Sequence, residues 1–312
     1  MAETTPEPRE TAQSEAQGTS PTRVLTVGII IAALIAAAII VSAGRKKQQA
    51  SLPTPPGAAP SATEVVCLVP CGLQGPYGKI KDLYAVKRPD VKITQEVQNT
   101  ALLVRGIESG KFTGDVLFTL GDREIAYLRE RGKIQGEATS FAENSIAVLV
   151  PRDNPARLRP DHFADVASER VKHMGLPSPD INSVGYYAQQ ALQNAGLWEK
   201  LEGRIVRRDE PSRVGKLAAQ KRIQCGILYA SCLLESDKPG GEPTPRKKTK
   251  GLAEVPHEYY DRFYCQAAVL AGAKAPAAAR DFIRFWLSDE AQKVLQEAGF
   301  GRVSEATIAS AP

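Results

Sequence analysis

From Glu64 onward, the chain alternates short apolar runs rich in β-branched residues with amphipathic stretches of helical period. This alternation predicts an α/β fold with largely parallel strands, because a parallel connection needs a crossover, usually a helix, to return the chain. The strand-like runs are 65–69, 91–97, 115–120, 145–151, 204–208, 225–230 and 264–270. The helix-like stretches are 74–88, 100–109, 123–131, 184–196, 212–220, 276–288 and 289–298.

The first 63 residues have a different composition and stand outside this pattern. Residues 24–44 carry no charge and match the roughly 20 apolar residues that a helix needs to cross a bilayer. They follow a polar leader, 1–23, and precede a linker rich in Pro, Ala and Ser, 45–63, which predicts a flexible tether. Two interpretations stay open: the long leader favours an uncleaved membrane anchor, and the Val-Ser-Ala at 41–43 is compatible with a cleaved signal helix.

The charges on either side of the apolar run bear on its orientation. Arg45, Lys46 and Lys47 follow the run, whereas Arg9 and Arg23 precede it. The positive-inside bias therefore argues weakly against an external C-terminal domain. The character of the C-terminal domain outweighs this bias. We therefore expect a single-pass anchor in the cell membrane, with the domain periplasmic or at the cell surface.

About 250 residues remain to form a core, which is enough for one large domain or two lobes. The 40 Lys and Arg are scattered among 35 Asp and Glu, and the net charge is +5. No basic stripe is interleaved with aromatic residues, so nucleic acid is not expected as a partner. Residues 235–251 hold three Pro, three Gly and five basic residues, a composition that predicts a solvated loop.

Motifs of common enzyme classes are missing from the sequence. It contains no G-x-S-x-G elbow, phosphate-binding P-loop, H-E-x-x-H or G-x-G-x-x-G following a strand. The three histidines, His162, His173 and His257, stand in polar contexts without metal-ligand spacing, and each is interpreted as a surface residue. We therefore expect a protein that is not an enzyme and has no cofactor.

Small or hydroxyl residues recur where a predicted strand gives way to a predicted helix. Cys71 and Gly72 follow the first strand, Asn99 and Thr100 follow the second, and Ser183 precedes a later helix in a capping position. The start of a helix presents unpaired backbone N–H groups and a partial positive charge. Several such starts converging on one cleft would bind an anion without Lys or Arg, although capping alone explains each junction taken singly.

Five stretches carry a family resemblance, and they follow that family's order. They are TALLVRGIESGKFTGDVLFTLGDREIAYLRERGKI, NSIAVLVPRDNP, YYAQQALQNAGLWEKL, CGILYAS and AAVLAGAKAPAAARDFIRFWLSDEAQKVLQEAGFG. From Glu64 to about Arg302 the chain resembles the molybdate-binding components of ABC transporters. The resemblance implies the two-lobed type II periplasmic binding-protein fold, in which residues 64–148 and 268–312 form lobe one and 149–267 form lobe two.

The same resemblance implies a function and a set of ligand contacts. In that family two lobes close over a tetrahedral oxyanion, here expected to be molybdate or tungstate. The resemblance implies a monomeric, membrane-tethered protein that hands the oxyanion to an ABC transporter permease. Carried over position by position, the ligand contacts are Cys71, Gly72, Asn99, Thr100, Ser183, Val184 and Tyr229.

One position departs from the family. The family usually has a serine in the first loop, where both its hydroxyl and its backbone N–H hold the ligand, and this chain has Gly72 preceded by Cys71. A glycine keeps the N–H and loses the hydroxyl. Losing one donor to a desolvated dianion costs about 1.5 to 3 kcal/mol, which leaves tungstate, another oxyanion or a metal species open as ligand.

The five cysteines leave three interpretations open: buried apolar thiols, one or two disulfides in an oxidising compartment, or a thiolate site for a soft metal. They are Cys67, Cys71, Cys225, Cys232 and Cys265. If the resemblance holds, Cys71 and Cys232 both border the cleft and are the thiolate candidates. The alternative functions are therefore a sensor or scavenger of a soft metal on the same fold, or a thiol enzyme with Cys71 as nucleophile.

Overall fold

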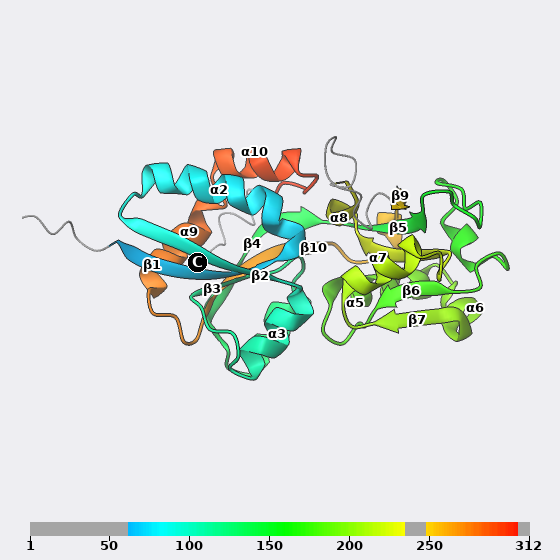
Figure 1. The fold of residues 1–312 in the computed structure, drawn as a ribbon, viewed down its shortest axis with the longest axis horizontal. Helices are drawn as coiled ribbons and strands as arrows, with labels where there is room; N and C mark the ends of the chain where they lie inside the picture. The colour runs from blue at the N-terminus through cyan, green and yellow to red at the C-terminus, as the bar shows by residue number, and fades with distance from the viewer. Residues whose placement is uncertain (1–61, 235–247, 305–312) are drawn as a thin grey trace, which may run out of the picture. The chain divides into compact units, whose positions relative to one another are not determined.

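The computed structural model describes residues 62–234 and 248–304, and within them the chain forms two mixed five-stranded sheets (Figure 1). The first sheet, with the helices that cover it, is lobe one, and its strand order is β2-β1-β3-β10-β4. Its strands are β1 (Thr63–Pro70), β2 (Val91–Gln98), β3 (Val116–Phe118), β4 (Ile134–Asn144) and β10 (Phe263–Leu270).

The second sheet, with its helices, is lobe two, and its strand order is β7-β6-β8-β5-β9. Its strands are β5 (Ile146–Pro151), β6 (Met174–Pro177), β7 (Ile205–Arg208), β8 (Cys225–Tyr229) and β9 (Thr249–Glu254). The strands β1, β3, β6 and β8 lie inside their sheets and are buried along most of their length, as parallel strands covered by helices are, whereas β2 and β7 are partly exposed edge strands.

The expectation of largely parallel sheets is corrected by the two strands next to the crossings. In lobe one, β10 runs antiparallel to β3 and β4, and in lobe two β5 runs antiparallel to β8 and β9. The sequence pattern did not predict β4, β6 or β9. The first half of β4 and most of β9 are polar and partly exposed, and β6 is four residues long, so neither an apolar run nor an alternation marks them.

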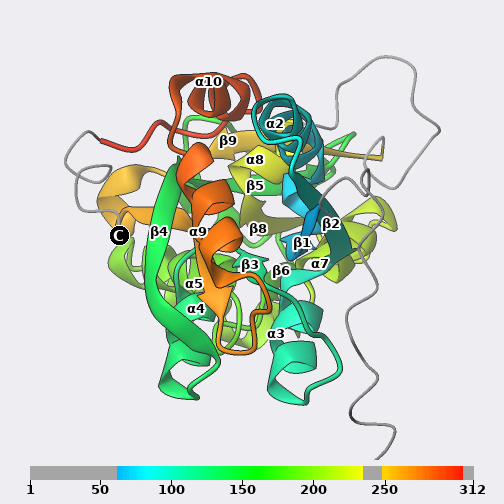
Figure 2. The same cartoon turned by 90° about the vertical axis from the view of Figure 1, so that its left-hand side faces the viewer.

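Seven α-helices of the described residues match the predicted stretches to within a few residues, and two short ones, 198–201 and 230–234, were not predicted. Those of lobe one are α2 (Gln74–Lys87), α3 (Thr100–Glu108), α4 (Arg123–Glu130), α9 (Pro276–Phe285) and α10 (Asp289–Glu297). Those of lobe two are α5 (Ser183–Asn194), α6 (Trp198–Leu201), α7 (Pro211–Ala219) and α8 (Ala230–Leu234). Short 3-10 helices are η1 (Cys71–Leu73), η2 (Phe163–Ala167), η3 (Glu202–Arg204) and η6 (His257–Tyr259). Although α2 and α10 are far apart in sequence, they lie side by side (Figure 2).

The chain crosses between the lobes twice. It leaves the first sheet at the end of β4 and enters the second at β5, one residue later, and it returns between β9 and β10. The predicted lobe boundaries, after 148 and after 267, stay a prediction; the strands change sheets a few residues before each of them. Only Ser145 separates β4 from β5, so at this crossing one sheet leads almost directly into the other.

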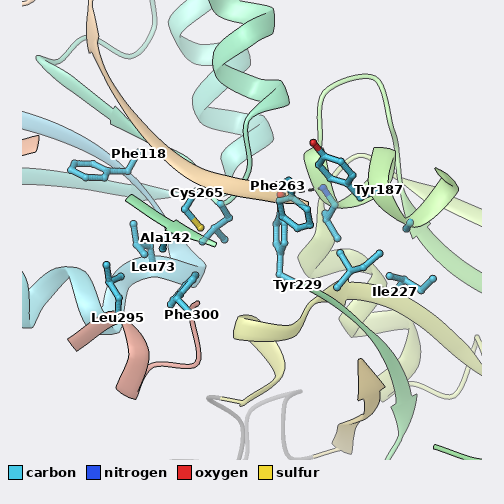
Figure 3. Close-up of a cluster of buried hydrophobic side chains, with 14 of the residues drawn as sticks. Leu73, Phe118, Ala142, Tyr187, Ile227, Tyr229, Phe263, Cys265, Leu295 and Phe300 are labelled. Carbon is cyan, nitrogen blue, oxygen red and sulfur yellow. Dashed lines mark hydrogen bonds between the residues drawn. The ribbon is translucent and has the colours of Figure 1, made fainter. Parts of the chain in front are cut away.

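One buried apolar cluster extends through both lobes along these crossings. In lobe one, Phe118 and Phe141 pack on Trp286 with ring centroids 4.6 and 4.9 Å away. At the crossing, Phe263 of β10 stacks on Tyr187 of α5 at 4.2 Å (Figure 3). The crossing strand β10 is thus held in lobe one by pairing with β3 and β4, and to lobe two by the aromatic packing of Phe263.

The predicted membrane segment, 24–44, the leader and residues 45–61 of the linker lie outside the described residues, as does 235–247 of the predicted loop. In the part of the chain that the structure describes, no helix has the length and apolar character needed to span a bilayer.

Candidate interlobe binding site

A pocket of about 330 Å³ opens between the two lobes. Lobe one contributes residues that follow β1, β2 and β3, including the starts of η1 and α3, and lobe two contributes β5, α7, β8, α8 and β9. The lining residues are Cys71, Gly72, Asn99, Thr100, Leu120, Leu149, Pro211, Ser212, Gly215, Lys216, Leu228, Tyr229, Cys232, Leu233 and Thr249. Five of the seven predicted contacts are in this set, and Ser183 and Val184 are outside it.

Helix starts from both lobes face the pocket. In lobe one, Asn99 is the N-cap of α3 and its Oδ1 accepts a hydrogen bond from the Ala101 N–H at 3.0 Å, so it caps as predicted. In lobe two, α7 begins with Pro211 at its first turn, and no side chain caps it. Ser212 therefore brings both a hydroxyl and an uncapped helix start to the pocket.

Tyr229 is held as a hydrogen-bond donor. Its hydroxyl oxygen accepts the Val184 N–H at 3.1 Å, which leaves the hydroxyl hydrogen available to another acceptor. The side chain is 3% exposed, and burial raises the pKa of the phenol well above its usual value. Tyr229 therefore stays protonated over the working pH range, and Val184, though outside the pocket lining, sets the direction of that hydroxyl.

The structure gives a steric reason for glycine in the first loop. A Cβ atom on Gly72 would lie 2.7 Å from Cys232 Sγ and 2.9 Å from Leu120 Cδ1. The thiol of Cys232, on lobe two, fills the space that a serine side chain would need. The hydroxyl that the family usually presents here is replaced by an apolar contact across the cleft, and the backbone N–H is kept.

Ser183 is engaged by a residue that the sequence did not single out. Ser183 is the first residue of α5 rather than its N-cap, which is Asn182. Its N–H donates to Glu124 Oε1 at 2.9 Å, and its hydroxyl donates to Glu124 Oε2. Glu124 lies on α4 of lobe one, so the start of α5 is covered by a carboxyl group from the opposite lobe.

The Glu124 side chain is buried in this contact, with 1% of the residue exposed. Burial is the main influence and raises the pKa of the carboxyl above 4.5, the hydrogen bonds from Ser183 lower it, and the charge of Asp122 raises it further. Burial raises the pKa of Tyr229 and of Cys265, and the charge of this carboxyl group raises both further. A carboxyl whose pKa is higher in the folded than in the unfolded protein favours folding when it is protonated.

This gives a pH prediction. Below pH 4.5 the protonated Glu124 makes its full contribution to the free energy of unfolding. That contribution is lost as the pH rises through the pKa that Glu124 has in the folded protein, which is higher than in the unfolded chain. We expect the free energy of unfolding of Glu124→Gln, relative to wild type, to rise over that window, because glutamine does not ionise. Urea unfolding of both proteins between pH 4 and 8 measures it; parallel pH profiles would contradict it.

Other contacts hold the lobes together around this site. Arg105 of α3 pairs with Asp209 of lobe two at 2.7 Å, half exposed at the rim. The Tyr187 hydroxyl donates to Asp122 at 2.9 Å, and the Arg123 guanidinium lies 4.2 Å from the Tyr186 ring centroid. The start of α4, residues 121–124, is therefore docked against the start of α5.

The cysteines and histidines can also be placed. All five cysteines lie in the described part of the chain and none is in a disulfide, so the disulfide interpretation does not hold in this structure. Burial raises the pKa of Cys67 and of Cys225 to about 12, so these are inert apolar thiols. Among the described residues no cluster of three metal-ligating side chains occurs, and none of the three histidines lines the pocket.

The sequence missed four residues that shape the site. Ser212 and Lys216 had a usable signal, because Glu-Pro-Ser at 210–212 is a helix start and Lys216 follows one turn later on the same face. Gly121 and Glu124 had none. Their importance depends on which surface of lobe two faces α4, and no periodicity encodes that.

Comparison with known proteins identifies the family. The family model described as "Bacterial extracellular solute-binding protein" matches residues 65–301. The chain belongs to this family. Because these are binding proteins of ABC transporters, it is a non-enzymatic solute-binding protein, as the sequence predicted.

The individual relatives are distant. YvgL of Bacillus subtilis, assigned by its name as an ABC transporter substrate-binding lipoprotein, is 22% identical over 71% of this chain and 80% of its own length. The molybdate-binding protein ModA of Haemophilus influenzae is 21% identical over 70% of this chain and 82% of its own. The periplasmic molybdate-binding protein of Azotobacter vinelandii covers 77% of this chain and all of its own, with a TM-score of 0.61 and 17% identity. The predicted resemblance and the two-lobed fold are confirmed.

Proposed function

We propose that this solute-binding protein captures a tetrahedral oxyanion of the molybdate or tungstate class in the interlobe pocket. The observation that carries the proposal is the convergence of helix starts and hydroxyl groups from both lobes on one pocket. The proposed donors are the backbone N–H groups of Cys71, Gly72, Thr100 and Ser212 and the hydroxyls of Thr100, Ser212 and Tyr229. Asn99 positions α3, and Ser183 and Val184 act indirectly through Glu124 and Tyr229.

The charge around the pocket is consistent with an anion. Lys216 is the lining residue with a full positive charge, and it is exposed, so its contribution is a screened attraction rather than a buried ion pair. Neutral donors therefore do most of the binding. Hydrogen bonds to an ionised acceptor are worth about 1.5–3 kcal/mol each, so their number and geometry decide which oxyanion is held.

A second candidate ligand is favoured by the apolar part of the lining. Leu120, Leu149, Leu228 and Leu233 line the pocket together with Pro211, and 330 Å³ exceeds what one tetrahedral oxyanion fills. An anion with a small apolar body, such as an organic phosphate, would use this volume. The two candidates share the donor set and differ in whether the leucines are covered.

A thermal-shift panel tests both candidates. It compares molybdate, tungstate, sulfate, phosphate and a three-carbon organic phosphate with Cu(I) as a thiophilic ion. We expect molybdate or tungstate to raise the melting temperature by several degrees, because a ligand at about 100 times its Kd stabilises the folded state by about 2.7 kcal/mol. A larger shift with the organic phosphate would establish the second candidate. A shift with Cu(I) alone would contradict both and point to Cys71 and Cys232.

We also propose that the protein is membrane-anchored and works with an ABC transporter permease. A membrane anchor at residues 24–44, with the tether at 45–63, would keep a monomeric binding domain near its permease, outside the cytoplasm. Release of the soluble part by signal cleavage would contradict the tether; mass spectrometry of the mature protein distinguishes the two.

A further inference from the structure

The start of α5 lacks the cap that its own sequence offers. Asn182 occupies the N-cap position, and asparagine is among the best N-cap residues, but its side chain makes no capping bond. Its amide instead donates to the backbone oxygens of Ser178 and Asp209, at 3.2 and 2.8 Å. The N–H at the first turn is left for another acceptor, and that acceptor is Glu124 of the opposite lobe.

The geometry of Glu124 is that of an anion bound at a helix start. One carboxyl oxygen accepts the Ser183 N–H and the other accepts the Ser183 hydroxyl. The Ser183 hydroxyl oxygen in turn accepts the Arg123 N–H at 3.0 Å. The carboxyl group lies at the positive end of a 12-residue helix, where the dipole and the uncapped N–H groups favour negative charge and so oppose the burial that raises its pKa.

We propose that the Glu124 carboxyl group is an internal substitute for a solute anion: it occupies the donors at the start of α5 and directs the solute to the starts of α3 and α7. The statement that the solute binds at the starts of α3 and α7 rests on the proposed function. The statement that Glu124 occupies the donors of α5 does not. Glu124 is thereby a specificity-determining residue, since it withholds the donors at the start of α5 from the ligand.

The arrangement has a consequence for lobe closure. In a protein whose lobes are bridged by the solute alone, the ligand supplies the contact between them. Here Glu124 already links lobe one to α5, and Arg105 with Asp209 adds a second link at the rim. We expect the ligand-free protein to keep its lobes engaged, and the Ser183 N–H to be insensitive to added oxyanion.

Removing the carboxyl group should create a site for a free small anion. In Glu124→Ala the donors of Ser183 face an emptied space of carboxylate size, and formate is the probe that matches it. We expect formate to raise the melting temperature of Glu124→Ala by about 2 °C or more and to leave wild type unchanged. The control is Glu130→Ala, since Glu130 lies on the same helix with its side chain 78% exposed. A folded Glu124→Ala that formate stabilises no more than it stabilises the control would overturn the proposal.

A second variant covers the case in which Glu124→Ala does not fold. Glu124→Gln keeps the side-chain volume and one acceptor oxygen, so we expect it to fold and to ignore formate. Its amide oxygen is a weaker acceptor than a carboxylate, and exchange of the Ser183 N–H should accelerate about tenfold relative to wild type. Unchanged exchange would refute the internal anion. Neither readout needs an oxyanion, so failure of the proposed function would show separately, as a wild type that no oxyanion stabilises.

Discussion

Gly121→Ala is expected to weaken solute binding about 100-fold while leaving the protein folded. A Cβ atom on Gly121 would overlap Cβ and Oγ of Ser183 and lie 3.3 Å from the Tyr229 hydroxyl. The overlap is with the root of a side chain rather than with a flexible tip, so it cannot be relieved by rotation. The hydroxyl of the buried Thr119 also donates to the Gly121 carbonyl at 2.6 Å, which prevents the loop from moving aside.

The strain of Gly121→Ala falls on the contact between the lobes. Gly121 belongs to lobe one and both of its neighbours belong to lobe two, so separating the lobes removes the overlap without unfolding either sheet. If the engaged state loses about 2.7 kcal/mol, the apparent affinity falls about 100-fold, since only that state presents all the donors together. Titration calorimetry with molybdate measures the loss, and small-angle X-ray scattering measures the separation.

Gly78→Ala is the matched control. Gly78 lies in α2, and nothing stands within 4 Å of the Cβ that the substitution adds. Alanine there should leave the affinity unchanged and stabilise the helix by about 0.5–1 kcal/mol. An unchanged affinity in a folded Gly121→Ala would mean that engagement of α4 with α5 is not required for binding.

The sequence predicted the features that depend on interactions between residues close together in the chain. Apolar runs and amphipathic stretches predicted the buried strands other than β6 and the long helices, because each of those signals is local. The helix starts at Cys71, Asn99 and Thr100 were predicted for the same reason, and the structure brings them to one pocket. The edge strand β9 was missed because its exposed, polar residues carry no period.

What the sequence could not supply was the pairing of surfaces between the lobes. Ser183 was predicted as a ligand contact because it starts a helix, and the structure places a carboxyl group from α4 on it. Gly72 was noted as a lost hydroxyl, and the structure explains it by the thiol of Cys232. Both facts depend on residues more than 50 positions away in the sequence, and neither leaves a local signature.

Asp115→Ala is expected to cause the largest loss of stability. Asp115 precedes β3, is 3% exposed, and accepts three backbone N–H groups. Its Oδ2 accepts the Val66 N–H of β1 at 2.8 Å, and its Oδ1 accepts the N–H groups of Lys274 and Ala275 at 2.6 and 2.9 Å. One carboxyl group thus joins the first strand of lobe one to the segment that enters α9.

Alanine at this position would leave those three N–H groups without their acceptor in a partly buried setting. With about 1–3 kcal/mol for each orphaned donor and some replacement by water, we expect a loss of about 4 kcal/mol, which lowers the melting temperature by roughly 10 °C. Asp115→Asn should lose less of the free energy of unfolding, because the amide keeps one acceptor oxygen. It should still lose some, because its NH₂ group would face a backbone N–H that needs an acceptor. Asp82→Ala, on the exposed side of α2, should change stability by about 0.5 kcal/mol or less. If urea unfolding gives Asp115→Ala a free energy of unfolding within about 1 kcal/mol of wild type, the Asp115 carboxyl group is not what holds β1 to α9. The hydrogen bonds between strands and the aromatic packing around Trp286 would then hold them together.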